Sequence, residues 1–113
     1  MISNTLKIHM LKRMILIREF ENAVSEYKDK KYIYGGAHCY NGEEAVAVGV
    51  CSALNQTDYI VSNHRPHGHA IAKGMDPRII MAEMFGKIDG SNSGKGGSMH
   101  MKRLKRYMPV NGF

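Results

Sequence analysis

Histidine and arginine side chains gather in one short segment of the chain. His64 and Arg65 are followed closely by His67 and His69, directly after the run Tyr59–Ser62. An arginine guanidinium offers a planar fork of N–H donors that suits a phosphate or a carboxylate. Imidazole nitrogens donate or accept hydrogen bonds and titrate near neutral pH. These residue types indicate an anion-binding segment.

The same three histidines have two other interpretations. They could ligate a metal ion, but structural zinc usually takes four ligands, often including cysteine. Neither cysteine nor a carboxylate lies within residues 64–69, so we expect no metal ligands in the chain. On spacing alone, a solvated loop without a ligand remains an alternative to the anion site.

The residues flanking this segment predict the elements that position it. The run Tyr59–Ser62 is typical of a short strand, and a helix-compatible run over 70–73 stops at Gly74. In an open α/β sheet, ligands bind in loops at the carboxyl ends of strands. A helix that begins there offers free N–H groups to an anion. We therefore expect an α/β fold, mostly helical in this chain with one or two short strands.

Two more helices are predicted on either side of residue 40. Residues 5–28 read as a long amphipathic helix capped by Ser3 or Asn4, which suits a subunit contact or packing within one domain. Its apolar positions are Leu6, Met10, Met14, Ile17, Val24 and Tyr27. Asn41 as N-cap with Glu44 predicts a capping box. The uncharged run 45–54 predicts a helix buried on nearly all faces in a larger assembly, with a face exposed when this chain is alone.

The last third of the chain contains a helix and a glycine-rich segment. Asp76 and Pro77 begin the helix, and Gly86 ends it. Residues 87–100 form a glycine-rich loop that lacks the Ser or Thr after lysine that a Walker A loop needs, because Gly96 follows its lysine. The loop is either a flexible surface segment or one that brings backbone N–H groups, or His100, to a ligand.

Composition limits the remaining function classes. The chain has 113 residues and a formal net charge of +6, with 43% hydrophobic residues. The basic residues cluster near position 103, but no nucleic-acid motif accompanies them, so nucleic-acid binding is the lesser interpretation. No apolar run is long enough for a membrane span, and no signal peptide is recognised. The two cysteines suggest reduced thiols, and we expect a cytoplasmic protein.

Three segments taken together resemble the alpha subunit of the thiamine-diphosphate-dependent dehydrogenase component of pyruvate and acetoin (2-oxo acid) dehydrogenase complexes. They are residues 36–45 (GAHCYNGEEA), 64–69 (HRPHGH) and 94–100 (GKGGSMH). Their order and spacing match that family from about Leu11 to the end. The resemblance implies that residues 1–113 are the N-terminal portion of one thiamine-diphosphate-binding domain.

The resemblance also implies a role for individual residues. Arg65 matches the arginine that contacts the cofactor diphosphate, and His64 matches its cofactor-contacting neighbour. His38 matches a histidine near the thiazolium and the substrate, which makes it both cofactor-binding and catalytic. His67 matches a histidine of the same loop that helps to order the site, and we expect it to be catalytic together with His38. His100 matches the histidine that ends the glycine-rich segment, and we expect it to bind the cofactor.

What the resemblance implies beyond these residues completes the expected enzyme. Magnesium would be held by a Gly-Asp-Gly segment, which this chain lacks, and by a later asparagine. The partners would be a beta subunit, a lipoyl-bearing acyltransferase and a small 2-oxo acid or acetoin, without nucleic acid or membrane. The enzyme would cleave a C–C bond next to a carbonyl and pass the acyl group to a lipoyl carrier. The alternative is a non-catalytic assembly module from a truncated or split gene.

Overall fold

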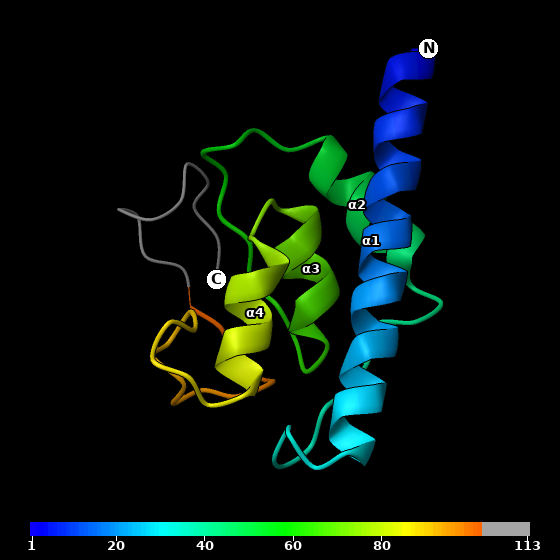
Figure 1. Cartoon of the computed structure of the whole chain (residues 1–113). Coiled ribbons are helices and arrows are strands. Elements are labelled where there is room, and N and C mark those ends of the chain that lie inside the picture. Colours follow the sequence, from blue (N-terminus) through cyan, green and yellow to red (C-terminus); the bar gives the residue numbers. More distant parts are fainter. Residues whose placement is uncertain (103–113) are drawn as a thin grey trace.

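A long N-terminal helix forms one side of the molecule, and the shorter described helices lie beside it (Figure 1). The computed structural model describes residues 1–102. Its helices are α1 (Asn4–Asp29), α2 (Glu44–Ser52), α3 (Pro66–Ala72) and α4 (Pro77–Met84). Helices α1, α2 and α3 contact one another pairwise, and α4 adds Ile80 and Met84 to the shared core. The basic cluster around residue 103 lies outside the described residues.

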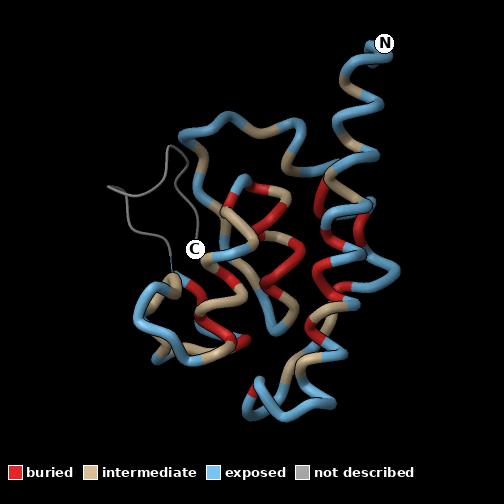
Figure 2. Tube along the Cα trace, in the orientation of Figure 1, coloured by how far each residue is buried: buried red, intermediate tan, exposed pale blue. Residues whose placement is uncertain are grey.

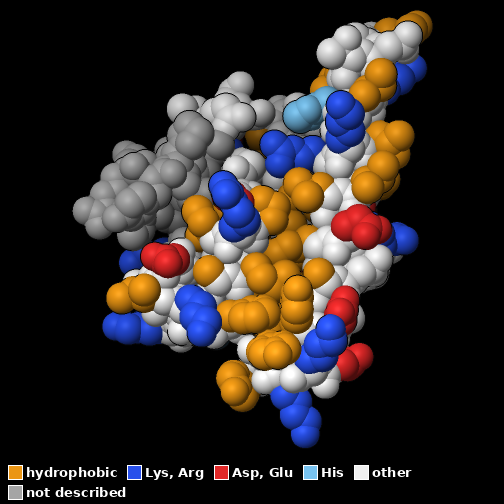
Figure 3. Space-filling view, in the orientation of Figure 1, with side chains coloured by type: hydrophobic (Ala, Val, Ile, Leu, Met, Phe, Trp, Pro, Cys, Tyr) orange, Lys and Arg blue, Asp and Glu red, His pale blue; other side chains and the backbone are white. Residues whose placement is uncertain are grey.

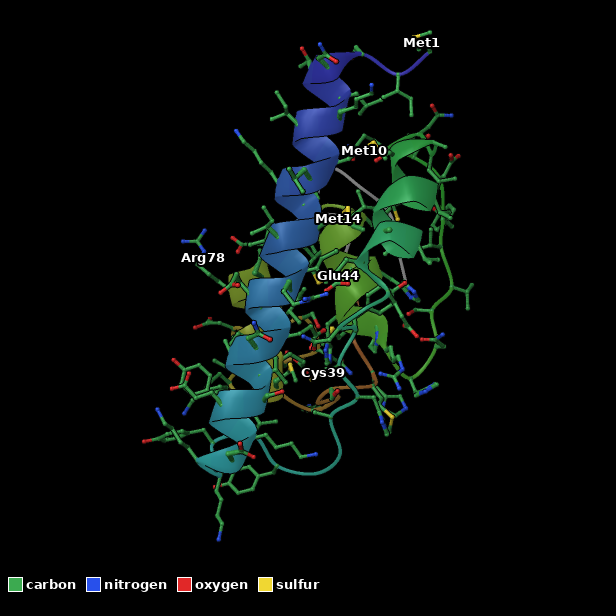
Figure 4. The ribbon with its side chains drawn as sticks, turned by 90° about the vertical axis from the view of Figure 1, so that its right-hand side faces the viewer. Met1, Met10, Met14, Cys39, Glu44 and Arg78 are labelled. Carbon is green, nitrogen blue, oxygen red and sulfur yellow. The ribbon has the colours of Figure 1, made fainter. Side chains whose placement is uncertain are left out.

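Helix α1 confirms its sequence prediction to within one residue at each end. Ser3 caps it, since the Ser3 hydroxyl accepts the Leu6 N–H at 3.1 Å. Met10 and Met14 pack against the core, and Figure 4 shows both on α1. The most buried residues of the helix are Ile17, Phe20, Glu21 and Val24. The first turns of α1 lie apart from the short helices and are largely exposed (Figure 2). Because α1 extends beyond the other helices, the molecule is elongated and measures 45 × 29 × 20 Å.

Helix α2 differs from its prediction in its cap. The N-cap residue is Glu43, which makes no side-chain capping bond, so the capping box expected at Asn41 is wrong. Instead Glu44 accepts a hydrogen bond from Arg18 of α1, and this bond lowers the pKa of the Glu44 carboxyl. The Glu44 side chain therefore forms an ion pair with Arg18 of α1 and takes no part in a capping box.

Only one side of α2 is buried, because its described neighbours α1 and α3 both lie on that side. Ala47 and Val48 are buried, whereas Val46 and Val50 are 64% and 58% exposed. The face of α2 that we expected to be exposed in this chain alone is exposed, and burial on nearly all faces in a larger assembly stays a prediction. The exposed valines border a hollow of about 160 Å³ that also involves Cys51, Ile60, Val61 and His69.

The predicted short strand does not form. Residues 59–62 belong to no helix or strand, and no strand occurs in residues 1–102. Tyr59 and Val61 are 72% and 96% exposed. A strand is defined by its ladder of hydrogen bonds to a neighbour, and the described part of the chain supplies no neighbour here. The β-branched residues of this run were therefore not enough to predict a strand correctly.

Helix α4 begins as predicted at its Asp-Pro pair. The Asp76 carboxylate accepts the Arg78 N–H at 2.9 Å, and hydrogen bonds from Arg78 lower its pKa. After the helix, Gly86 adopts a left-handed φ of 71°. Phe85 stacks on Tyr32, with ring centroids 5.9 Å apart. Figure 3 shows the hydrophobic side chains that gather on this face between α1 and α4.

Candidate functional site

The glycine-rich loop is organised around one buried carboxylate. Glu83 of α4 is fully buried, and its two oxygens accept four backbone N–H groups of the loop. Oε2 accepts from Asn92 at 2.7 Å and Gly94 at 2.8 Å, and Oε1 accepts from Gly96 at 2.7 Å and Gly97 at 3.3 Å. These N–H groups therefore serve an internal anion and are not available to a ligand.

The electrostatics of Glu83 follow from this geometry. Burial raises the pKa of the carboxyl, but the four N–H donors lower it by more, so that the pKa lies below its ordinary value. Glycine is required where the loop passes closest to its surroundings: a Cβ at Gly90 would lie 2.4 Å from the Glu83 backbone. Glycine at position 90 thus reflects the close approach of the loop backbone to α4.

A second buried group connects the loop to α1 and α3. His67 Nδ1 lies 2.8 Å from Glu21 Oε1, and His67 Nε2 lies 2.8 Å from Ser98 Oγ. Glu21 and His67 are fully buried, and Ser98 is 5% exposed. We call these three residues the buried chain. Both ring nitrogens of His67 therefore have partners among the described residues, and its ordering and catalytic roles stay predictions.

Three of the predicted cofactor residues come together near the surface. Arg65 Nη1 donates to the carbonyl of Cys39, which directly follows His38. The His38 and His64 rings meet edge to face, with centroids 5.2 Å apart. Both histidines are exposed and Arg65 is partly buried. We call His38, His64 and Arg65 the surface cluster. Figure 4 shows the neighbouring Cys39 beside α1.

His69, which sequence analysis grouped with these residues, has a separate structural role. Its Nδ1 lies 2.6 Å from Ser62 Oγ and its Nε2 lies 3.1 Å from the Tyr40 hydroxyl. Burial lowers the pKa of His69, which favours the neutral ring. A Cβ at Gly68 would come within 2.3 Å of the Tyr40 ring, so α3 packs with its backbone directly on that aromatic side chain.

The other two predictions concern His100 and metal ligands. His100 is exposed at the end of the glycine-rich loop, and its backbone carbonyl lies 2.2 Å from where a Cβ on Gly96 would stand. Its role at a cofactor stays a prediction. In residues 1–102, no three His, Cys, Asp or Glu side chains are grouped so that they could hold a metal ion. None of the described helices is long and apolar enough to cross a membrane.

Sequence analysis missed Glu21, Glu83 and Ser98. Glu21 carried a signal, because it lies four residues after Ile17 and three before Val24 on the apolar stripe of α1. Glu83 lies between Ile80 and Met84 on the predicted apolar face of α4, where a charge also calls for a buried partner. Ser98 offered no such signal, since its neighbours are those of an ordinary polar loop.

Comparison with known proteins relates this geometry to a family. Residues 12–113 match the model of a family described as "Dehydrogenase E1 component". The chain is 52% identical over 99 residues to the alpha subunit of the acetoin:2,6-dichlorophenolindophenol oxidoreductase of Bacillus subtilis, covering 88% of this chain. It is 48% identical over 97 residues to the alpha subunit of the same name from Cupriavidus necator, covering 86% of this chain.

A pyruvate dehydrogenase relative matches at similar strength. The E1 component subunit alpha of pyruvate dehydrogenase from Zymomonas mobilis is 44% identical over 95 residues, or 83% of this chain. The matched regions make up 30%, 29% and 27% of these three relatives. The chain therefore spans less than a third of their length.

Proposed function

Because this chain belongs to the dehydrogenase E1 component family, we propose that it forms the part of an alpha subunit that receives the diphosphate of thiamine diphosphate. Arg65 and His64 bind the diphosphate, and His38 lies nearer to the reacting carbons. His67 orders the segment that carries Arg65. His100 belongs to the same proposal, as a further cofactor contact from the glycine-rich loop.

The observation that carries the proposal is the convergence of the surface cluster. Arg65 reaches across to the Cys39 carbonyl, which brings together two segments that lie 26 residues apart in sequence. The imidazole contact between His38 and His64 joins the same two segments. One guanidinium and two accessible imidazoles thus share one surface, and their contacts within residues 1–102 do not use up all their N–H groups.

The residues of the surface cluster fit a diphosphate. Arginine has five N–H donors, and the bond to Cys39 accounts for only one of them, so that the fork can still bind an anion. The start of α3 follows immediately at Pro66. The magnesium that accompanies a diphosphate requires a near-octahedral oxygen shell, and we propose that its ligands come from a Gly-Asp-Gly segment that is not part of this sequence.

The chemistry divides between the cofactor and this chain. When bound, thiamine diphosphate supplies the nucleophilic carbon and the electron sink for cleaving a bond next to a carbonyl. The exposed His38 imidazole can donate a hydrogen bond to a developing oxyanion or move a proton, since an imidazole exchanges its proton readily near neutral pH. Arg65 and His64 hold the anion and so fix the orientation of the bound molecule.

For the whole protein, we propose a dehydrogenase that cleaves a C–C bond of pyruvate or acetoin and passes the acyl group to a lipoyl carrier. The relatives named for acetoin and pyruvate support this class of substrate. A beta subunit and a lipoyl-bearing acyltransferase are the proposed partners, and the cytoplasm is the proposed location. The choice between pyruvate, acetoin and a branched 2-oxo acid stays open.

The decisive experiment is calorimetric titration of the complete alpha–beta enzyme with thiamine diphosphate and magnesium. Arg65→Ala should weaken binding by about 1.5–3 kcal/mol, the scale of a charge-assisted hydrogen bond. Arg78→Ala is the matched control, because Arg78 is an arginine paired with Asp76 on the surface. An unchanged dissociation constant for Arg65→Ala would refute the role. Residues 1–113 alone should bind the cofactor with a dissociation constant above the micromolar range, since the proposed Gly-Asp-Gly magnesium segment is not part of this sequence.

A second candidate function is a non-catalytic assembly module. Its support is the open face of α2, where Val46 and Val50 are exposed and line one hollow together with Val61. Contiguous exposed apolar side chains often mark protein–protein contacts. Titration of a diphosphate distinguishes the two candidates, because an assembly module has no need for Arg65 to bind an anion.

A further inference from the structure

We infer that Ser98 and Glu21 are positioning residues for the surface cluster, which they hold in place through His67. The inference rests on the proposed function only in what the cluster binds. It assigns roles to two side chains that lie outside that cluster and touch no ligand. The buried chain would make the glycine-rich loop and the histidine–arginine segment behave as one unit.

The first argument is geometric. Glu21 lies on α1, His67 is the second residue of α3, and Ser98 lies at the end of the glycine-rich loop. The two contacts span 46 and 31 residues of sequence, each at 2.8 Å. A single imidazole therefore joins three segments that no continuous helix connects.

The second argument concerns the protons of the buried chain. When Glu21 is ionised, its carboxylate only accepts hydrogen bonds, and the proton between Glu21 and His67 is then on Nδ1. Nε2 then either accepts from the Ser98 hydroxyl or, if protonated, donates to it. A hydroxyl can rotate to satisfy both arrangements, whereas alanine satisfies neither. Serine or threonine at position 98 thus keeps His67 in one orientation whatever its protonation state.

The third argument leads from His67 to the surface cluster. His67 follows Arg65 by two residues, with Pro66 between them, and proline fixes its own φ. A rotation of the His67 backbone would therefore move Arg65 relative to the Cys39 carbonyl. The packing of Gly68 against Tyr40 secures the next residue of α3. Ser98 acts on Arg65 through this short and stiff connection.

The fourth argument is that the loop itself is anchored. Gly97, the residue before Ser98, donates its N–H to Glu83 at 3.3 Å, and Gly96 does so at 2.7 Å. These bonds hold the backbone next to Ser98 in place, and the Ser98 hydroxyl contacts His67 from that position. Glu21 holds the opposite nitrogen, and its Oε2 has no hydrogen-bond partner among the described residues. His67 is consequently the main polar partner of this buried carboxylate.

NMR spectroscopy of the 113-residue chain tests the inference without any cofactor. In Ser98→Ala, the ¹⁵N shifts of the His67 ring should change, and the Arg65 guanidinium and His64 ring signals should move with them. Ser98→Thr should restore all three sets of signals, because it keeps the hydroxyl. Inorganic pyrophosphate, followed by the Arg65 and His64 signals, should bind Ser98→Ala about tenfold more weakly, equivalent to about 1.4 kcal/mol.

The control and the outcomes separate the two proposals. Ser93→Ala removes a hydroxyl elsewhere in the same loop and should leave the Arg65 and His64 signals unchanged. The inference is overturned if Ser98→Ala leaves those signals at their wild-type positions, or if Ser98→Thr fails to restore them. If wild-type chain shows no response to pyrophosphate, the proposed anion site fails, while the ligand-free signals still decide whether Ser98 positions Arg65.

Discussion

Two members of the buried chain and the surface cluster, His67 and Arg65, lie two residues apart in sequence, but the polar groups of the two sets differ in how far protein partners occupy them. In the buried chain both nitrogens of the imidazole have protein partners. In the surface cluster Arg65 uses one donor on the Cys39 carbonyl, and the histidines are exposed. The contrast teaches which polar groups serve the fold and which remain available for a ligand.

The same contrast applies to the two expected anion sites. The N–H groups of the glycine-rich loop meet the internal carboxylate of Glu83, whereas the start of α3 meets no internal anion in the described residues. A glycine-rich loop by itself is therefore a poor guide to a phosphate site. Such a loop can bind a phosphate only where no carboxylate of the protein already accepts its N–H groups.

The largest effect on stability should come from changing Glu83, the buried carboxylate that accepts the N–H groups of the glycine-rich loop. Glu83→Gln replaces one acceptor oxygen with an N–H₂ group that faces N–H donors, and it removes the charge. We expect a loss of about 2–4 kcal/mol in the free energy of unfolding, measured by urea denaturation. Glu19→Gln, at an exposed position of α1, should change stability by less than about 0.5 kcal/mol. Equal effects of the two changes would contradict the role of Glu83.

The pH dependence of stability gives a second, smaller test. The pKa of Glu83 is lowered in the folded chain, so its contribution is complete above the unfolded value of about 4.3 and is lost as the pH falls through the folded value. Denaturation at a series of pH values should show this loss in the wild type. Part of the slope should vanish in Glu83→Gln, and identical slopes for both proteins would refute the assignment.

The smallest effect on stability should come from the surface cluster. His38→Ala removes an exposed ring that meets the His64 ring edge to face, so we expect less than about 0.5 kcal/mol of destabilisation. In the complete enzyme the same change should lower turnover more than cofactor affinity. Steady-state kinetics at saturating cofactor would measure this, and a loss confined to the apparent cofactor affinity would count against the proposed position of His38.

The sequence predicted those helices whose signals are local. The period of apolar residues and the Ser3 cap located α1, and the Asp76–Pro77 pair located α4. The strand at Tyr59–Ser62 was wrong because a strand depends on a partner that composition does not reveal. The capping box at Asn41 was wrong because Glu44 instead pairs with Arg18, a contact 26 residues away in the chain.

The candidate site divides in the same manner. Residue types alone indicated that Arg65 and its neighbouring histidines bind an anion, and the resemblance added His38. That His67 is buried and His64 exposed could not be read from their spacing, because it depends on where α3 meets α1. Glu21 could have been found, since a carboxylate on an apolar stripe needs a partner, but its partner could not.

The contact between Gly68 and Tyr40 has a consequence for how the family can vary. A Cβ at position 68 would lie 2.3 Å from that ring, a distance that no side chain tolerates. A lineage that replaces this glycine must therefore first or simultaneously replace the tyrosine with a smaller residue. Positions 40 and 68 should accordingly change as a pair, and the order of the two substitutions is constrained, because alanine at 68 is acceptable only after the ring has gone.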